Sequence, residues 1–260
     1  MQERHTNRER YFNEQAWTTE KYYLPYIKGF LGKMPDSVLE VGCGEGGNLL
    51  PFAIAGANVT GVDLAARKIE NARRFFAERR VDGTFISKDI FQLTELKGTF
   101  QLIIVHDVIE HIYDKELFLN GLKDYLAPEG CMFVAFPSWQ MPFGGHQQIA
   151  RSRVVSHFPF IHLLPKSLYK VTLKLFGESD SMIEDLLDIK HTKCPIERFH
   201  KAVKATGYII EDSRFYFINP NYEVKFGLKP RKLWSVIAAI PWVRNFFCTS
   251  SFHILRPNHV

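Results

Sequence analysis

The strongest structural signal in the chain is Ser37-Val-Leu-Glu-Val-Gly-Cys-Gly-Glu-Gly-Gly-Asn48. Its first half is a short apolar run of the kind that forms a buried parallel strand. Glycines then crowd together from Gly42 to Gly47, and a turn this tight needs residues without a Cβ atom. We expect a helix over residues 48–55. The order strand, glycine turn, helix is typical of nucleotide binding, because free N–H groups at the helix start face the ligand.

Two glycine patterns fit this turn. Gly42, Gly44 and Gly47 match the G-x-G-x-x-G pattern of dinucleotide-binding folds. Glu40, Gly42, Gly44 and Gly46 match E-x-G-x-G-x-G, which resembles motif I of the class I S-adenosylmethionine (SAM) dependent methyltransferases. The carboxylate of Glu40 favours the second pattern, because it would repel a pyrophosphate but suits the sulfonium and amino groups of SAM.

The composition is that of a soluble globular protein. The chain has 260 residues, of which 46% are hydrophobic and 23% charged, with a net charge of +5. This length predicts one large domain, or one domain with an insertion. The charge permits an anionic partner without requiring one. The cysteines are scattered, the N-terminus is charged with no apolar signal region, and no run approaches the ~20 apolar residues of a membrane span. We therefore expect a cytoplasmic protein.

The order of the predicted elements indicates an α/β fold. Strands are expected at residues 37–41, 57–63, 84–87, 100–105 and 131–136, with helices between them. This succession predicts a doubly wound, Rossmann-like sheet with right-handed crossovers. Two later strands, near 208–218 and 249–255, would complete a seven-stranded mixed sheet. Residues 1–16 are polar, and we expect there a loosely held helix.

The rhythm of strands and helices breaks after the fifth strand. Residues 138–194 show no strand pattern and contain several helical stretches. We interpret residues 1–260 as a single domain and residues 138–194 as a helical insert within it. The insert follows a strand whose end borders the predicted cleft, so we expect a lid over the substrate, hinged at Gly144-Gly145.

The resemblance to class I SAM-dependent methyltransferases extends over residues 20–137 and, more loosely, 195–256. The nearest likeness is to the small-molecule group that includes the quinone O-methyltransferases. The resemblance implies that SAM is the cofactor and that its parts lie along the strand ends. The implied cofactor-binding residues are Glu40, Gly42, Cys43, Gly44 and Gly46 for the methionine end, Asp63 for the ribose, Leu64 next to it, Asp89 and Ile90 for the adenine, and His106 and Asp107 below the sulfonium. Asp63 lies 19 residues after Gly44, close to the spacing of a carboxylate that binds ribose hydroxyls.

The chemistry of the acceptor is less defined by sequence. His146 follows two glycines of the insert, and its ordinary pKa suits a general base that takes a proton from a substrate hydroxyl. A loop histidine with no catalytic role is the alternative. In some quinone O-methyltransferases the positions of Asp107, Glu110 and His111 are linked to a divalent ion. We expect no metal here, because a hard ion prefers more oxygen ligands than this stretch offers.

The predicted activity is methyl transfer from SAM to a small or lipid-like acceptor, at oxygen. An NAD-dependent oxidoreductase and a non-catalytic SAM-binding module remain as alternatives. A nucleic-acid methyltransferase is disfavoured, because the signature of amino methylation on bases is missing after the fourth strand, where His106-Asp-Val-Ile stands. Aromatic residues at 158–164 and 234–247 could hold a lipophilic substrate or touch a membrane surface, although packing within the protein also explains them.

Overall fold

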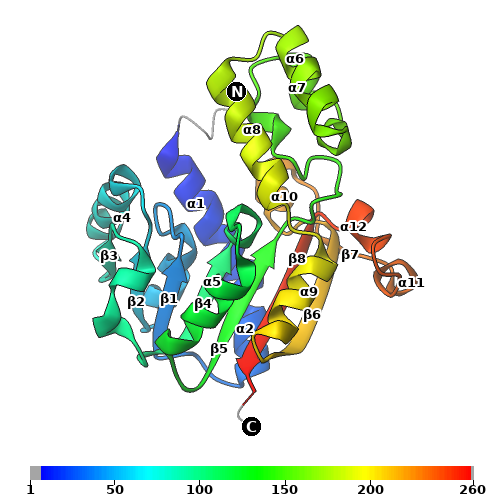
Figure 1. The fold of residues 1–260 in the computed structure, drawn as a ribbon. Helices are drawn as coiled ribbons and strands as arrows, with labels where there is room; N and C mark the ends of the chain where they lie inside the picture. The colour runs from blue at the N-terminus through cyan, green and yellow to red at the C-terminus, as the bar shows by residue number, and fades with distance from the viewer. Residues whose placement is uncertain (1–6, 259–260) are drawn as a thin grey trace.

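The computed structural model describes residues 7–258, and a single mixed sheet forms its centre (Figure 1). The strand order is β3-β2-β1-β4-β5-β8-β6-β7. The parallel strands are β1 (Ser37–Val41), β2 (Asn58–Val62), β3 (Thr84–Ile86), β4 (Phe100–His106) and β5 (Leu126–Phe136). The antiparallel strands are β6 (Tyr208–Ile218), β7 (Arg231–Lys232) and β8 (Ser250–Pro257). The predicted α/β class and doubly wound arrangement are confirmed.

The sheet has one strand more than predicted. The two-residue strand β7 pairs with the outer edge of β6, through Tyr216 opposite Lys232 and Ile218 opposite Arg231. Two residues are too few to show the alternation of apolar and polar side chains on which strand prediction depends. Residues 221–246 therefore read as irregular chain in the sequence.

Helices cover both faces of the sheet because the strand residues are apolar on both sides. On one face, Leu102 and Ile104 pack in one core with α1 (Arg8–Thr18), α2 (Leu24–Leu31), α3 (Leu50–Ile54) and α4 (Ala66–Glu78). On the other face, Ile103 and Val105 pack in a second core with α5 (Lys115–Leu122) and α9 (Ile196–Ala205). Burial on both faces is the usual state of a parallel sheet with helical crossovers.

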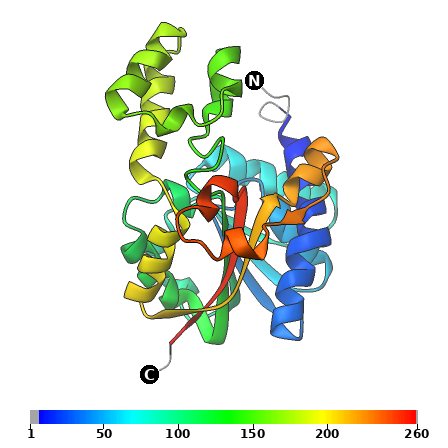
Figure 2. The ribbon, with the colours of Figure 1, turned by 90° about the vertical axis from the view of Figure 1, so that its right-hand side faces the viewer.

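Residues 138–194 form a helical projection above the sheet edge (Figures 1 and 2). They contain α6 (Arg153–His157), α7 (Lys166–Leu175) and α8 (Asp180–Thr192), which share a small apolar core centred on Tyr169 and Leu173. The glycines that we expected to act as a hinge have another structural reason. A Cβ atom on Gly144 would lie 2.1 Å from the carbonyl oxygen of Trp139, and one on Gly145 would lie 2.2 Å from Cβ of His162. These glycines allow close packing, and the lid itself remains a prediction.

The remaining helices lie between β6 and β8. They are α10 (Asn221–Phe226), α11 (Ser235–Ala238) and α12 (Arg244–Phe247). All four cysteines are free and buried. Across residues 7–258, no helix is both long and apolar enough to cross a membrane.

Candidate active site

The predicted cofactor residues meet at the carboxyl edge of the parallel strands. Gly42 follows β1, Asp63 follows β2 and Asp107 follows β4. The register aligns these ends, since Val41 pairs with both Val62 and Val105. The chain enters β4 beside β1, so the direction of strand winding reverses between these two strands. Ligands of open α/β sheets bind at such a reversal.

The glycine turn is held in a conformation that other residues would strain. The backbone of Gly42 has a φ of +73°, and a Cβ atom there would lie 2.4 Å from Cγ2 of Val108. The amides of Gly42 and Cys43 donate to the carbonyl oxygen of Val62, at 2.7 and 3.1 Å. Gly46, with a φ of +79°, precedes the 3-10 helix η3 (Gly47–Leu49). The turn is thereby fixed against the end of β2.

Glu40 is buried beneath this turn, with only 1% of its surface exposed. Asn48 donates to Oε1 of Glu40 at 2.7 Å, and Thr19 donates in turn to Asn48 at 2.9 Å. Among residues 7–258, no hydrogen-bond partner reaches the buried Oε2 atom. Burial raises the pKa of Glu40 to about 8, against the smaller lowering effect of the Asn48 hydrogen bond. A buried carboxyl with one unused oxygen is suited to a cationic or donating ligand.

Asp63 braces the glycine turn from the next strand. Its Oδ2 accepts from the amide of Gly44 at 2.9 Å, and its Oδ1 accepts from the amide of Ala65 at 2.8 Å. Each carboxylate oxygen can accept a second hydrogen bond, so these contacts leave capacity for ribose hydroxyls. The neighbouring Leu64 is 78% exposed. This exposure is what we expect of an apolar side chain beside an open ligand site.

Asp89 and Ile90 lie beyond the end of β3. Asp89 is exposed, and its Oδ1 accepts from the amide of Phe91 at 3.0 Å, which caps the 3-10 helix η4 (Ile90–Gln92). Ile90 is buried, and its carbonyl oxygen accepts from the hydroxyl of Tyr125 at 2.6 Å. Asp89 and Ile90 therefore both have a local structural role, whether or not they also contact adenine.

His106 and Asp107 end the strand next to β1. His106 is buried, with Nε2 placed 3.0 Å from the hydroxyl of Tyr23 and Nδ1 placed 3.6 Å from Oδ2 of Asp107. Asp107 is exposed and has a φ of +53°, an uncommon value for a residue other than glycine. Such strain clusters at functional sites, and here it turns the chain sharply at the sheet edge.

The N-terminal helix is bound to the site more firmly than its polar sequence suggests. We expected a loosely held helix over residues 1–16, of which 1–6 lie outside the described residues. Helix α1 instead packs on the glycine turn through its buried residue Phe12. Arg8 makes two hydrogen bonds to the buried carboxylate of Glu45, at 2.7 and 2.5 Å. Burial, followed by the charge of Asp107, raises the pKa of Tyr11, so this hydroxyl stays protonated near the same edge. The alternation of buried and charged residues in α1 was a weak signal of this role.

The insert contributes His146 to a second cluster, next to the end of β4. Nε2 of His146 and Nε2 of His111 each lie 4.0 Å from Oε1 of Glu110. Ligand atoms of the three side chains lie within 4.8 Å of one another. Glu110 is 5% exposed, and within residues 7–258 neither of its carboxyl oxygens has a hydrogen-bond partner. His146 itself has a φ of +55°.

Burial controls the ionisation of this cluster. It raises the pKa of Glu110 well above its ordinary value, with the charge of Asp107 acting in the same direction. It lowers the pKa of His111, and it lowers that of His146 to about 4. Both imidazole rings are therefore neutral at neutral pH, the form that accepts a proton or binds a metal ion.

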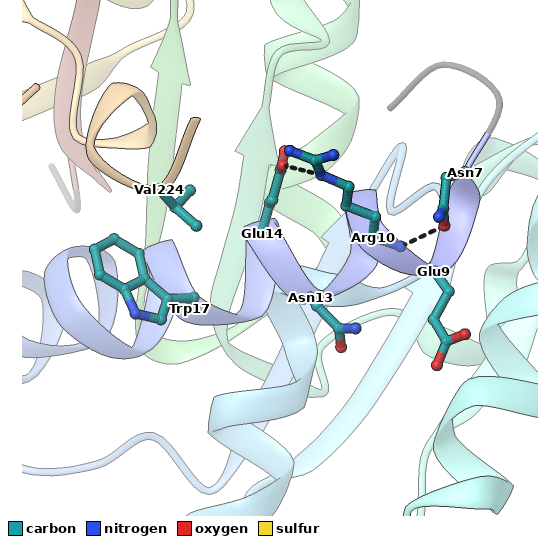
Figure 3. A pocket seen from close by; sticks show the side chains of 7 residues that line it. All are labelled: Asn7, Glu9, Arg10, Asn13, Glu14, Trp17 and Val224. Atoms are coloured by element: carbon teal, nitrogen blue, oxygen red, sulfur yellow. Dashed lines mark hydrogen bonds and ion pairs between the residues drawn. The ribbon is translucent and has the colours of Figure 1, made fainter. Parts of the chain in front are cut away.

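A groove of about 510 Å³ lies on another side of α1 (Figure 3). Its lining residues are Asn7, Glu9, Arg10, Asn13, Glu14, Trp17 and Val224. None of the predicted cofactor or catalytic residues lines it. Polar side chains of α1 dominate its wall, and we assign it no part in the site.

Comparison with known proteins agrees with this geometry. Residues 38–130 match the family described as "Methyltransferase domain". A protein named ubiquinone biosynthesis O-methyltransferase from Bartonella tribocorum is 31% identical over 144 residues, covering 52% of this chain and 58% of the relative. One with the same name from Chelativorans is 36% identical over 98 residues, covering 38% and 39%. The matches thus span about half of these relatives or less.

Solved structures show the same fold. The plantazolicin methyltransferase BamL, in complex with a triazolic desmethylPZN analog and SAH, aligns with a TM-score of 0.58 at 13% identity, over 98% of this chain and 88% of that one. A putative sarcosine dimethylglycine methyltransferase from Galdieria sulphuraria aligns with a TM-score of 0.57 at 15% identity, over 92% and 84%. The sequence match identifies residues 38–130 as a methyltransferase domain, and the chain around it shares the fold of these solved methyltransferases.

Proposed function

We propose that the protein transfers the methyl group of SAM to an oxygen of a small, lipophilic acceptor. The observation that carries this proposal is the buried Glu40 beneath the glycine turn, with its Oε2 atom unused. The methionine part of SAM offers a cationic amino group and a sulfonium. Either would favour an ionised carboxylate that burial otherwise disfavours.

Other residues of the edge suit the rest of the cofactor. The carboxylate of Asp63 already faces the glycine turn and retains the capacity to accept ribose hydroxyls. Asp89 and Ile90 lie past the next strand, where the adenine would extend. His106 and Asp107 border the turn from β4. Helix α1, held by Arg8 and Glu45, would close the methionine end from above.

The choice of oxygen and of a lipophilic acceptor is supported by the curated relatives, which are named ubiquinone biosynthesis O-methyltransferases. In the transfer, a lone pair of the acceptor oxygen attacks the methyl carbon while the carbon–sulfur bond breaks. S-adenosylhomocysteine (SAH) leaves with the electron pair of that bond. SAM is already activated, so the protein supplies alignment and removal of water.

His146 is our candidate for the base that takes the acceptor proton. Its neutral ring lies at the edge where β4 ends, and the carboxyl of Glu110 stands 4.0 Å behind it. A pKa of about 4 makes His146 a weak base by itself. The ionised form of Glu110 would stabilise the imidazolium, but burial raises the pKa of Glu110 and disfavours that form. Proton transfer to His146 would therefore require Glu110 to lose its own proton.

A divalent metal ion is the second candidate for this step. Two neutral imidazoles and a carboxyl with unsatisfied oxygens form a suitable donor set, so Glu110, His111 and His146 would hold the ion. Such an ion would lower the pKa of the acceptor hydroxyl. This geometry favours a metal more than the sequence did, since His146 adds a ligand from a distant segment.

The test uses SAM carrying a deuterated methyl group and a lipid extract of membranes. Mass spectrometry of the products should find the label on an oxygen of a lipid-soluble small molecule, with SAH formed in equal amount. Glu40→Gln should reduce the transfer, and Glu78→Gln, which changes an exposed glutamate at the end of α4, should preserve it. Label on nitrogen, on nucleic acid or on no product would contradict the proposal.

A further inference from the structure

Exposed apolar side chains gather on the segment between β7 and β8, which Figure 1 shows projecting beside β6 and β8. Trp234 is 78% exposed, Val236 73% and Trp242 56%, and Ile240, Phe246 and Phe247 are exposed as well. Lys229, Arg231 and Lys232 precede them and are also exposed. We call these residues the 229–247 surface. We propose that this surface docks the protein onto an anionic lipid bilayer.

The charge of the chain is concentrated in this region. No aspartate or glutamate occurs in residues 224–260, which contain six lysines and arginines. The whole chain has 33 basic and 28 acidic residues, so residues 1–223 have 33 − 6 = 27 basic against 28 acidic residues, a net charge of −1. All of the excess positive charge therefore belongs to the part of the chain that carries the exposed tryptophans. Lysine and arginine beside an apolar surface attract anionic lipid headgroups.

The 229–247 surface is held in place by polar contacts beneath it. The carboxylate of Glu197 accepts from the amide of Trp242 at 2.9 Å, from Nε of Arg244 at 3.0 Å and from Nδ2 of Asn245 at 2.5 Å. Oδ1 of Asn245 accepts from the hydroxyl of Ser138 at 2.7 Å. Trp242 has a φ of +67°, which is a strained value for a bulky residue. The fold thus fixes a backbone that presents Trp242 outward.

Inward-facing residues of the same segment form a small core. Leu233 and Cys248 are buried together with Ile196, and Ile237 packs against them. Alternate residues of the segment therefore have different roles: Leu233 faces the protein, while Trp234 and Val236 face outward. Packing within the protein therefore explains Leu233 and Ile237. It does not explain the exposed Trp234 and Trp242.

The surface lies at the same sheet edge as the candidate active site. Strand β8 starts opposite the end of β5, with Ser251 paired with Phe136. The ring of Phe160 from the insert lies 6.4 Å from that of Phe246, so the insert and α12 adjoin (Figure 2). If the proposed function holds, a bilayer at this surface would supply a lipophilic acceptor to the edge where SAM binds; this last step rests on the proposed function.

A bilayer fits this surface better than a second copy of the chain. An isologous dimer would place the same patch on itself, and residues 224–260 contain no acidic residue that could pair with Lys229, Arg231 and Lys232 there. The mixture of tryptophan, aliphatic residues and flanking cations is the composition of a membrane interface. We therefore treat a dimer or an acidic protein partner as outcomes that the test must exclude.

The test measures binding to vesicles by sedimentation and by tryptophan fluorescence. The probes are vesicles of phosphatidylcholine alone and of phosphatidylcholine with phosphatidylglycerol. We expect binding to the anionic vesicles at low salt, a blue shift of the emission of Trp234 and Trp242, and weaker binding as salt rises. Two variants remove the surface: Trp234→Ser with Val236→Ser, and Lys229→Gln with Arg231→Gln and Lys232→Gln. The first should weaken binding about tenfold or more per side chain, and the second on the order of a hundredfold in total.

Matched controls alter equally exposed residues elsewhere, and they should bind as the wild type does. The apolar control is Ile54→Ser with Leu117→Ser, at positions 67% and 69% exposed. The charge control is Lys28→Gln with Lys201→Gln and Lys204→Gln. Circular dichroism shows whether each variant is folded, and calorimetry with SAM shows whether the cofactor site is intact.

The proposal is overturned if anionic vesicles do not bind the wild type, or if the controls lose binding as much as the surface variants. It is also overturned if sedimentation equilibrium shows a dimer that Trp234→Ser with Val236→Ser dissociates. Failure of the proposed function looks different, because SAM would then give no heat while vesicle binding persisted.

Discussion

Replacing Glu40 by glutamine tests how the cofactor site recognises SAM. Glutamine keeps the shape of the side chain and can keep the hydrogen bond to Asn48, but it cannot ionise. In the wild type, burial holds the pKa of Glu40 at about 8, so the free protein near neutral pH carries mostly the neutral carboxyl. Binding of a cationic amino group should draw the proton off.

The magnitude follows from this coupling. A charge-assisted contact to the amino group contributes about 1.5–3 kcal/mol, so Glu40→Gln should weaken SAM binding by about 10- to 150-fold at a pH where the carboxylate is formed. Below a pKa of about 8, ionisation costs about 1.4 kcal/mol per pH unit. The same coupling lowers the pKa of Glu40 in the complex by about 1–2 units, so the ratio of the two dissociation constants, variant over wild type, should rise by about 2- to 6-fold from about pH 6 to about pH 7. The ratio removes the titration of SAM itself, since both proteins meet the same ligand.

Calorimetry at several pH values measures this ratio, in two buffers with different ionisation enthalpies. The wild type should release a proton on binding SAM, and Glu40→Gln should not. Glu178→Gln, a change at another buried glutamate, is the control and should leave the slope unchanged. A ratio that stays constant between about pH 6 and pH 8, with no proton released, would refute an ionised Glu40 in the complex.

Glu40→Gln should weaken SAM binding, but in the absence of ligand it should stabilise the folded protein at high pH. The pKa of Glu40 is raised from 4.5 to about 8 on folding, so its protonated form stabilises the fold below about pH 4.5, and this contribution is lost as the pH rises through about 8. Above about pH 8, Glu40→Gln should therefore unfold at a higher temperature than the wild type. Thermal melting at about pH 9 measures this directly.

Three further predictions concern the rest of the site. Asp63→Ala should weaken SAM binding by on the order of a hundredfold or more in calorimetry, because two charge-assisted hydrogen bonds of about 1.5–3 kcal/mol each are lost; an unchanged dissociation constant would remove Asp63 from the site. Arg8→Gln should lower the free energy of unfolding by about 1–3 kcal/mol, because it leaves the buried carboxylate of Glu45 without its partner, and adding Glu45→Gln should recover part of the loss; an additive double mutant would show that the pair is not coupled. His146→Ala should lower turnover with little change in SAM affinity. Titration with Co²⁺, followed by absorption, distinguishes a metal ligand from a base. A Co²⁺ spectrum that the wild type shows and His146→Ala lacks indicates a metal site, whereas a loss of turnover in the variant with no Co²⁺ spectrum in the wild type indicates a base.

The sequence predicted the parts of the fold that depend on local patterns. The apolar runs of β1 and β4, and the glycines between Gly42 and Gly47, have short-range signatures, so the parallel sheet and the edge that holds the site followed from them. The acidic residue after β2 was also found by its spacing from Gly44. The two-residue strand β7 left no such pattern.

Contacts between distant segments could not be predicted in this way. The pairing of Arg8 with Glu45 depends on how α1 packs against the glycine turn, which no local pattern encodes. The meeting of Glu110 and His111 with His146 depends on the path of the insert. The expectation of no metal was made from Glu110 and His111 without His146, and it stays a prediction. The exposure of Trp234, in contrast to the burial of Leu233, likewise appears only once the chain is folded.

Calorimetric titration of the full chain with SAM, SAH and NAD shows which cofactor the glycine turn binds. Because Glu40 lies beneath the glycine turn and no pyrophosphate would be stable beside its ionised form, we expect SAM and SAH to bind and NAD to give no heat. Tight binding of NAD, with no heat from SAM or SAH, would contradict a SAM-dependent methyltransferase.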